Sequence, residues 1–493
     1  MNSTEFALIL RLEKFSVYII SKMKKLAVTT VILAGLVFPQ SAAFAQFKTK
    51  KTVEEAPKTE TELLLEKADS SETPVVITLD QALEIALSEN VSVKVADMEI
   101  QRTGYAKKGA YAALFPQIDV VGSYQRTIKK QAMYMSMGEG QEPMKIEVGM
   151  FNTLNASASA ALPLVSAQLW KSIKISGMDV ELAVEKARSS RLETVTQVKN
   201  SYFAILLAKE AFNVYKSVYE NAVDNFTEVQ KKYDAQKVSE FELVRAKTTV
   251  EQAIPNVYNA ESTIILALWQ LKAVLGVDLE MNIDVAGQLS DYSKQMFYDI
   301  HQHDSVSLDN NSAMKQLAIQ TEMLAETVKL QKYANIPTLA ASFNFSYMSM
   351  ANDVAFKNFP WIPYSTAGIS LSIPIFAGGK RYQAIRQAKN QYEQVKLQAD
   401  NTERQLMIAV RQSLNTMEMN MKSYYAAQNA VQSAQKAYDI AEAAYRVGRS
   451  TLIELNDAQL ALTQSRLAES QAIYNFVIAK SQLEQTIGQE LTK

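Results

Sequence analysis

Hydrophobic residues recur every three or four positions along two long stretches of the chain. One series runs from Leu243 to Val274 and another from Tyr424 to Tyr445, and in the first series small residues alternate with large ones. Sustained spacing of this kind places the apolar side chains along one face of a helix and is typical of coiled coils. The stretch 166–233 contains no proline and one glycine. It could form a helix on the order of 100 Å long.

Between the helical stretches, apolar and polar residues alternate one by one. This period predicts four strands, at about 117–127, 148–162, 338–350 and 365–373. Strands with one apolar and one polar face can lie on a soluble core, or between lipid and a water-filled lumen. Two hairpins are too few strands for a stable sheet, so these four would close into a barrel only together with strands from other chains.

The two halves of the chain match each other. Shifted by 212 residues, 233–276 falls on 445–488 without a gap, and shifted by 221 residues, 90–116 falls on 311–337. Each match is weak by itself, but the matches follow one another in the same order in both halves. We therefore interpret the chain as two copies of one long unit, which we place at 78–276 and 311–488.

Residues 1–45 have the features of a signal peptide. Met23-Lys24-Lys25 provides a positive start, an apolar stretch follows over 26–37, and Ala43-Phe44-Ala45 provides a cleavage site. The apolar stretch is too short to span a membrane comfortably. We expect Met23 to be the initiator, the residues before it to be an over-extended start, and the mature chain to begin at Gln46.

Composition narrows the possible functions. The chain has 51 basic and 52 acidic residues, no cysteine and two histidines. The charge balance does not indicate a nucleic-acid surface, and the absence of cysteine excludes disulfides and thiolate metal sites. His301 and His303 would share a face of a strand, but no third ligand accompanies them, so we expect no metal. Without a Ser/His/Asp set, a phosphate-binding loop or paired carboxylates in a pocket-like context, we expect neither a cofactor nor an enzyme.

The order of these elements resembles the TolC family of outer membrane efflux proteins, over nearly all of residues 78–488. Three motifs carry the resemblance: the stretch Thr78-Leu79-Asp80-Gln81-Ala82-Leu83, the stretch Ile373-Pro374-Ile375-Phe376-Ala377-Gly378-Gly379, and Tyr445-x-x-Gly448 followed by Ala458-Gln459. Thr78 and Gln81 also form the sequence pattern of a helix capping box. The resemblance implies a mainly α-helical protein with a transmembrane β-barrel. Three chains would share twelve strands in one barrel, continuous with a long periplasmic α-helical barrel.

In that arrangement the remaining segments connect the main parts. Residues 46–77 would form an N-terminal periplasmic linker, 277–310 an equatorial linker and 489–493 a C-terminal tail. The resemblance implies a passive exit duct in the outer membrane for small molecules or drugs. Its partners would be two more copies of the chain, a periplasmic adaptor (membrane fusion) protein, an inner-membrane RND or ABC transporter and outer membrane lipids. A duct for type I protein secretion and a periplasmic coiled-coil structural protein remain as alternatives.

The resemblance places the periplasmic aperture at the turn before Leu452. Glu454 and Asp457 match the family's aperture carboxylates, and Glu242 is the equivalent of Glu454 in the first copy. A ring of such groups would attract cations and raise the pKa values of its own members. Alternatively, these residues are acids in a first helical turn, where they favour the helix dipole.

The same turn is expected to bind the adaptor. Gly448, Arg449 and Ser450 form this tip, and Ser450 stands where the best-known member of the family has an arginine that latches the closed aperture. Because Gln236 occupies the position of Gly448 in the first copy, the first tip is expected to accept an adaptor hairpin less well. At the other end of the molecule, Phe359, Trp361 and Tyr364 are candidates for an aromatic girdle at the membrane surface, or for simple packing in a loop.

Overall fold

The computed structural model describes residues 74–135, 144–296, 307–352 and 360–489. These residues belong to one unit, Glu60–Lys493. The predicted signal peptide, most of the predicted N-terminal linker, the pair His301 and His303, and Phe359 lie outside the described residues.

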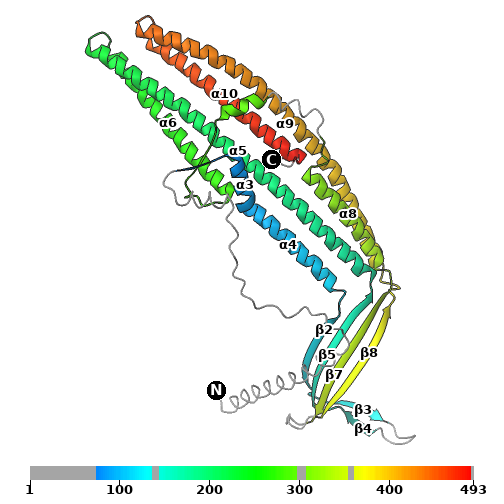
Figure 1. Ribbon diagram of the computed structural model, residues 1–493. Helices are drawn as coiled ribbons and strands as arrows, with labels where there is room; N and C mark the ends of the chain where they lie inside the picture. Colours follow the sequence, from blue (N-terminus) through cyan, green and yellow to red (C-terminus); the bar gives the residue numbers. More distant parts are fainter. Residues whose placement is uncertain (1–73, 136–143, 297–306, 353–359, 490–493) are drawn as a thin grey trace, which may run out of the picture. The chain divides into compact units, whose positions relative to one another are not determined.

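Helices make up most of the described chain, as predicted. Two pairs of antiparallel helices dominate it: α5 (Ala167–Asp234) with α6 (Glu240–Leu275), and α9 (Lys380–Arg446) with α10 (Leu452–Ile487). Helix α4 (Val91–Ala112) lies along α5, and α8 (Ser312–Tyr333) lies between α5 and α9 (Figure 1). The short elements α3 (Leu79–Glu89) and η1 (Leu289–Gln295) pack beside them.

The start of α3 confirms the capping box that was predicted there. The backbone N–H of Gln81 donates to the hydroxyl of Thr78 at 3.3 Å, and the N–H of Thr78 donates to Oε1 of Gln81 at 3.0 Å. Two N–H groups at the helix end thereby gain partners that the helix itself cannot supply.

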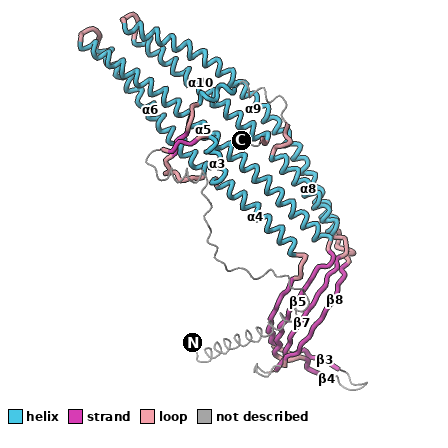
Figure 2. The backbone as a smooth tube through the Cα atoms, viewed as in Figure 1, coloured by secondary structure: helices cyan, strands magenta, loops and turns pink. Residues whose placement is uncertain are grey.

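The main sheet is antiparallel, with the strand order β2 (Gln117–Arg126), β5 (Asn152–Val165), β7 (Thr338–Ala351) and β8 (Trp361–Ser372) (Figure 2). Strand β5 begins four residues later than the predicted 148, because the backbone turns at Gly149 with a φ of +96°. Strand β8 begins before the predicted 365 and includes Pro363. An edge strand tolerates proline, since the missing N–H need not reach a neighbour.

Two smaller sheets accompany it. Strand β3 (Gln131–Met135) pairs with β4 (Met144–Val148) in an antiparallel ribbon, and β1 (Val75–Ile77) pairs with β6 (Ile283–Val285) in parallel. The sequence prediction contained neither pair.

The two faces of the main sheet differ in polarity. Because side chains opposite each other share a face, the strand register assigns Val120, Ala158, Phe345 and Ser365 to one row and Asp119, Ser159, Asn344 and Thr366 to the next row, on the other face. Further apolar side chains on the first face are Ile118, Phe343, Ile369 and Leu371. All residues of the edge strands β2 and β8 are exposed in the single chain.

The main hydrophobic core lies where α3, α5, α6 and α10 meet the β1–β6 pair. Tyr202, Leu271, Phe476 and Leu483 are fully buried in it. The hydroxyl of Tyr202 donates to the carbonyl oxygen of Ala286 at 2.7 Å. Burial raises the pKa of Tyr202 to about 12, so this hydroxyl keeps its proton and remains a donor at neutral pH.

In the described ranges, no helix combines the length and the hydrophobicity that crossing a lipid bilayer requires.

Candidate functional site

The two helical pairs end in turns of the same backbone course, at the ends far from the sheet (Figure 1). In the turn between α9 and α10, the N–H of Gly448 donates to Tyr445 at 3.0 Å and the N–H of Arg449 donates to Ala444 at 2.8 Å. These are the two hydrogen bonds by which a left-handed residue commonly closes a helix. The φ of Gly448 is accordingly +73°.

The turn between α5 and α6 repeats this pattern without a glycine. The N–H of Gln236 donates to Tyr233 at 2.8 Å, and the N–H of Lys237 donates to Lys232 at 2.8 Å. The φ of Gln236 is +60°, a conformation that costs a residue with a Cβ roughly 1–2 kcal/mol. The two turns therefore differ in their side chains rather than in their backbone course.

Space around Gly448 is open. A Cβ added there would meet no heavy atom within 4 Å. Only the positive φ favours glycine at this position, because the chain itself leaves the space beside it open. Arg449 is exposed beside it, and Ser450 is half-buried.

Glu454 caps the N-terminus of α10. The N–H of Thr451 donates to Oε2 of Glu454 at 2.9 Å, and the N–H of Glu454 donates to the hydroxyl of Thr451 at 3.3 Å. The hydroxyl of Ser450 donates to the same carboxylate oxygen. These hydrogen bonds, that of Ser450 foremost, lower the pKa of Glu454. Within one chain Glu454 thus occupies the position of a first-turn helix acid, and its carboxyl stays charged.

The two other predicted aperture residues lie apart from this cap. Asp457 is exposed one turn further along α10, while Glu242 is half-buried in the first turn of α6. Glu242 lies near the phenol of Tyr445, whose pKa is raised by burial first and by the charge of Glu242 second. The single chain therefore brings Glu242 of α6 to the end of α9.

A small cluster holds the two hairpins together near their turns. Its buried members are Val229, Ala246, Tyr445, Leu452 and Leu455. The ammonium of Lys232 lies 5.1 Å from the centre of the Tyr445 ring, a cation–π contact between α5 and α9. The sequence prediction did not include Lys232 or Tyr445 as functional residues. The match of Tyr233 with Tyr445 between the two copies was the available signal.

At the end of the chain's fold that carries the sheet, several aromatic side chains lie on the apolar face of the sheet. The rings of Phe345 and Tyr347 lie 5.6 Å apart, and those of Tyr347 and Trp361 lie 6.1 Å apart. Tyr364 pairs with Ser346, and strand alternation puts it on the opposite face from Trp361. The structure therefore separates Tyr364 from Trp361, and the neighbours of Trp361 are instead residues of β7.

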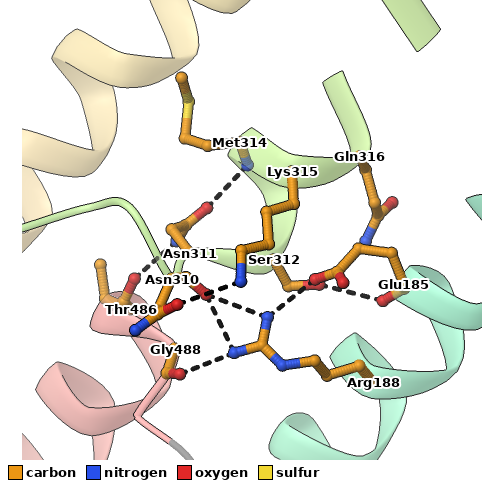
Figure 3. A network of polar contacts seen from close by, with 10 residues as sticks. All are labelled: Glu185, Arg188, Asn310, Asn311, Ser312, Met314, Lys315, Gln316, Thr486 and Gly488. Atoms are coloured by element: carbon orange, nitrogen blue, oxygen red, sulfur yellow. Dashed lines mark hydrogen bonds and ion pairs between the residues drawn. The ribbon is translucent and has the colours of Figure 1, made fainter. Parts of the chain in front are cut away.

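A network of hydrogen bonds, here called the joint, connects the C-terminal end of α10 to the start of α8 (Figure 3). The guanidinium of Arg188 donates to the carbonyl oxygen of Asn310 from both of its terminal nitrogens, at 3.0 Å each, and to that of Gly488 at 2.8 Å. Asn311 caps α8 through its Oδ1 and donates from Nδ2 to Thr486 at 2.6 Å. One side chain thereby ties the start of one helix to the end of another.

The first half of the chain has the same asparagine in the same role. Asn90 caps α4 and donates from Nδ2 to Val274 at 2.6 Å. The glycine that ends the helix to which each asparagine donates is tightly packed: a Cβ on Gly276, after α6, would lie 2.6 Å from the oxygen of Glu89, and one on Gly488, after α10, would lie 2.1 Å from that of Asn310. These joints fix where each helical pair leaves the core.

Among the described residues, no group of three or more histidine, aspartate or glutamate side chains is placed to hold a metal ion.

Comparison with known proteins gives consistent matches. The family model described as "Outer membrane efflux protein" matches residues 82–277 and 305–489. The outer membrane protein TolC of Vibrio cholerae is 20% identical over 385 residues, which cover 76% of this chain and 83% of that protein. Outer membrane protein TolC of Escherichia coli is 19% identical over 386 residues, which cover 73% and 78%.

Solved structures of similar fold include two outer membrane channels. The Campylobacter jejuni CmeC outer membrane channel superposes with a TM-score of 0.65 at 18% identity, covering 86% of this chain and 91% of that one. The open state of the Neisseria gonorrhoeae MtrE outer membrane channel gives a TM-score of 0.63 at 15% identity, covering 90% and 97%. At these identities the structures establish the fold.

Proposed function

The chain belongs to the outer membrane efflux protein family, and from this premise we propose that it is the outer membrane exit duct of a tripartite efflux system. Small molecules or drugs would pass through it without chemical change. It is an outer membrane protein whose helices extend into the periplasm. The energy for transport would come from an inner-membrane RND or ABC transporter.

The two-faced sheet is the observation that carries this proposal. In the part of the chain that the structure describes, β2 and β8 each leave one edge unpaired, and the apolar face of the sheet is uncovered. Open edges and a bare apolar face are unfavourable for a single chain in water. A barrel formed with other copies would remove both, with the apolar face toward lipid and the polar rows toward the lumen.

Strand length fits a membrane. A tilted strand needs about 9–11 residues to cross the hydrocarbon core. The four strands have 10, 14, 14 and 12 residues. Three copies would supply twelve strands, and β8 of one copy would pair with β2 of the next.

The helical turns would face the partner proteins. Helices α5 and α9, with 68 and 67 residues, reach about 100 Å from the sheet at ~1.5 Å per residue. We place the adaptor at Gly448, Arg449 and Ser450, where the open space around Gly448 would accept a partner helix. Glu454 and Asp457 from three chains would surround the aperture, with Glu242 beside them.

Ion conduction by the purified protein tests this function. Full-length protein extracted from outer membranes should migrate as a heat-sensitive trimer and should form long-lived conducting pores in a planar bilayer. A structural coiled-coil protein would be recovered from the soluble periplasm or would conduct no ions. Either result would refute the duct.

A further inference from the structure

The β3–β4 ribbon carries three methionine side chains on one face. The ribbon pairs with neither edge of the main sheet and is drawn beyond its end in Figure 1. Its register places Met135 opposite Met144 and Met133 opposite Ile146. Since residues two apart on a strand share a face, all three thioethers belong to the same face.

These methionines are accessible. Met133, Met135 and Met144 are 53%, 52% and 49% exposed, so none of them fills a core. Directly opposite side chains have Cβ atoms about 4.5–5.5 Å apart, and diagonal neighbours are about 7–8 Å apart, within the reach of long side chains. The three sulfur atoms can therefore approach one point in front of the ribbon.

The residue types favour a site in which sulfur binds a metal ion over a surface for hydrophobic contact alone. Exposed ribbons generally use β-branched and aromatic residues, and methionine gives no advantage in a strand. On this face Met135 and Met144 form the row at the tip of the ribbon, Met133 lies in the next row beside Ile146, and Val148 lies one row further toward the base. Thioethers are soft ligands that select soft cations such as Cu(I).

The charged side chains of the ribbon do not repel a cation from its methionine face. Lys145 and Glu147 lie on the other face, opposite Tyr134 and Ala132, and form an ion pair at 3.6 Å. The methionine face thus presents no ammonium group of the ribbon. Because the chain contains no cysteine, thioether sulfur is the only sulfur that this protein can offer to a soft ion.

We propose that Met133, Met135 and Met144 form a binding site for one soft monovalent metal ion, Cu(I) or Ag(I), on the face of the β3–β4 ribbon. No electron transfer is involved: the ion binds as a monovalent cation and leaves as one. The site is separate from the helical turns and stands whether or not the chain forms a duct.

Silver binding to the full-length protein in detergent tests the proposal. We expect the wild type to retain one Ag(I) per chain after gel filtration, by elemental analysis. The triple variant M133L/M135L/M144L should retain none, because leucine keeps the apolar area but removes the sulfur. The single variant M135L should bind about tenfold more weakly, a change of ~1.4 kcal/mol. X-ray absorption of the Cu(I) form should show only sulfur ligands in the first shell.

Two control variants identify the ligands. The double variant M98L/M419L removes two exposed methionines that lie on separate helices and should bind Ag(I) as the wild type does. The variant H301Q/H303Q should also bind normally. Undiminished binding by the triple leucine variant, loss of binding in H301Q/H303Q, or no binding by the wild type would each overturn the proposal.

Discussion

The guanidinium of Arg188 donates a hydrogen bond to the carbonyl oxygen of Gly488 at 2.8 Å, across 300 residues of sequence. The same guanidinium also holds the oxygen of Asn310. The residue that follows α10 and the segment just before α8 are therefore fixed to the first half of α5. Together with the main core and the cluster around Tyr445, this joint holds the second helical pair against the first.

Two glycines with nearly equal φ test the importance of that joint. In Gly488→Ala, the new Cβ would lie 2.1 Å from the oxygen of Asn310, at a φ of +67°. In the matched control Gly448→Ala, the φ is +73° but the space is open. We expect G448A to lower the free energy of unfolding by about 1 kcal/mol and G488A by well over ~2 kcal/mol. Thermal unfolding followed by circular dichroism measures both, and equal losses would contradict the packing at the joint.

A buried carboxylate makes stability depend on acid pH. The side chain of Glu326 is 4% exposed and contacts Lys171 at 2.6 Å and Lys174 at 3.0 Å. Hydrogen bonds from these two ammonium groups, and from that of Lys329 at 3.0 Å, lower its pKa from 4.5 to about 2. A carboxyl with a lowered folded pKa stabilises fully above its unfolded pKa, and this contribution is lost as the pH falls from about 4.5 toward about 2.

Glu326→Gln should remove that acid-dependent loss. We expect E326Q to be about 3 kcal/mol less stable at pH 7, because Lys171, Lys174 and Lys329 lose their partner. Its stability should then change less than that of the wild type between pH 5 and pH 2, in thermal unfolding at each pH. The control E322Q, at an exposed position of the same helix, should behave as the wild type does. An unchanged pH profile in E326Q would contradict this role.

The carboxylates at the second turn should control ion selectivity. Replacing Glu454 and Asp457 by Gln and Asn should weaken the cation preference in planar-bilayer recordings, and salt should screen the effect with a Debye length of ~10 Å at 0.1 M. Ser450→Ala removes the first of the hydrogen bonds that lower the pKa of Glu454. The cation preference of S450A should therefore be lost at a higher pH than that of the wild type. If the folded double variant keeps the cation preference of the wild type, Glu454 and Asp457 do not control selectivity, and Glu454 only caps α10.

The first turn should become more stable with glycine. Because Gln236 has a φ of +60°, Gln236→Gly should relieve strain and raise the free energy of unfolding by up to about 1 kcal/mol. The same variant gives the first turn the glycine of the second, so crosslinking to the adaptor at this turn should increase. Thermal unfolding measures the change. A Q236G variant that is less stable than the wild type would contradict the left-handed conformation of Gln236.

Local patterns predicted the features that depend on neighbouring residues. The three-and-four spacing from Leu243 onward lies within α6, and the capping box of Thr78 and Gln81 is present. The period of two placed Phe343 and Phe345 on the same face of a strand. Such features follow from the geometry of one helix or strand, so the sequence alone is sufficient for them.

Features that depend on distant contacts were not predicted. Apart from its ion pair with Glu185, Arg188 has no local pattern that distinguishes it from other helix arginines, and the two carbonyl groups that it ties together are more than 100 residues away. The β3–β4 ribbon was also missed. The segment around it is rich in residues typical of loops, and only pairing across the hairpin makes it a ribbon. The position of Tyr364 on the opposite face from Trp361 followed from where β8 begins, and strand boundaries are weakly marked in sequence.

Crosslinking between neighbouring copies tests the shared barrel most directly. In the described sheet β2 and β8 are the two opposite edges, about 14 Å apart at ~4.8 Å per strand, so a bond between them within one chain is excluded. The stretch Leu162-Pro163-Leu164 matches Ile373-Pro374-Ile375 at a shift of 211 residues, which relates β5 to β8, while the shift of 221 residues relates β2 to β7. If β8 of one copy pairs with β2 of the next as β5 pairs with β7, these two shifts carry the pair Ser159 and Asn344 onto Ser370 and Ser123. The variant S123C/S370C introduces nearly isosteric cysteines into a chain that has none.

Oxidation of S123C/S370C in isolated outer membranes should yield a covalent trimer on denaturing, non-reducing gels, and reduction should return it to monomer. The single variants S123C and S370C should remain monomeric under the same conditions. A double variant that is folded and membrane-inserted but stays monomeric, or that forms a ladder beyond three chains, would contradict a closed barrel shared by three copies.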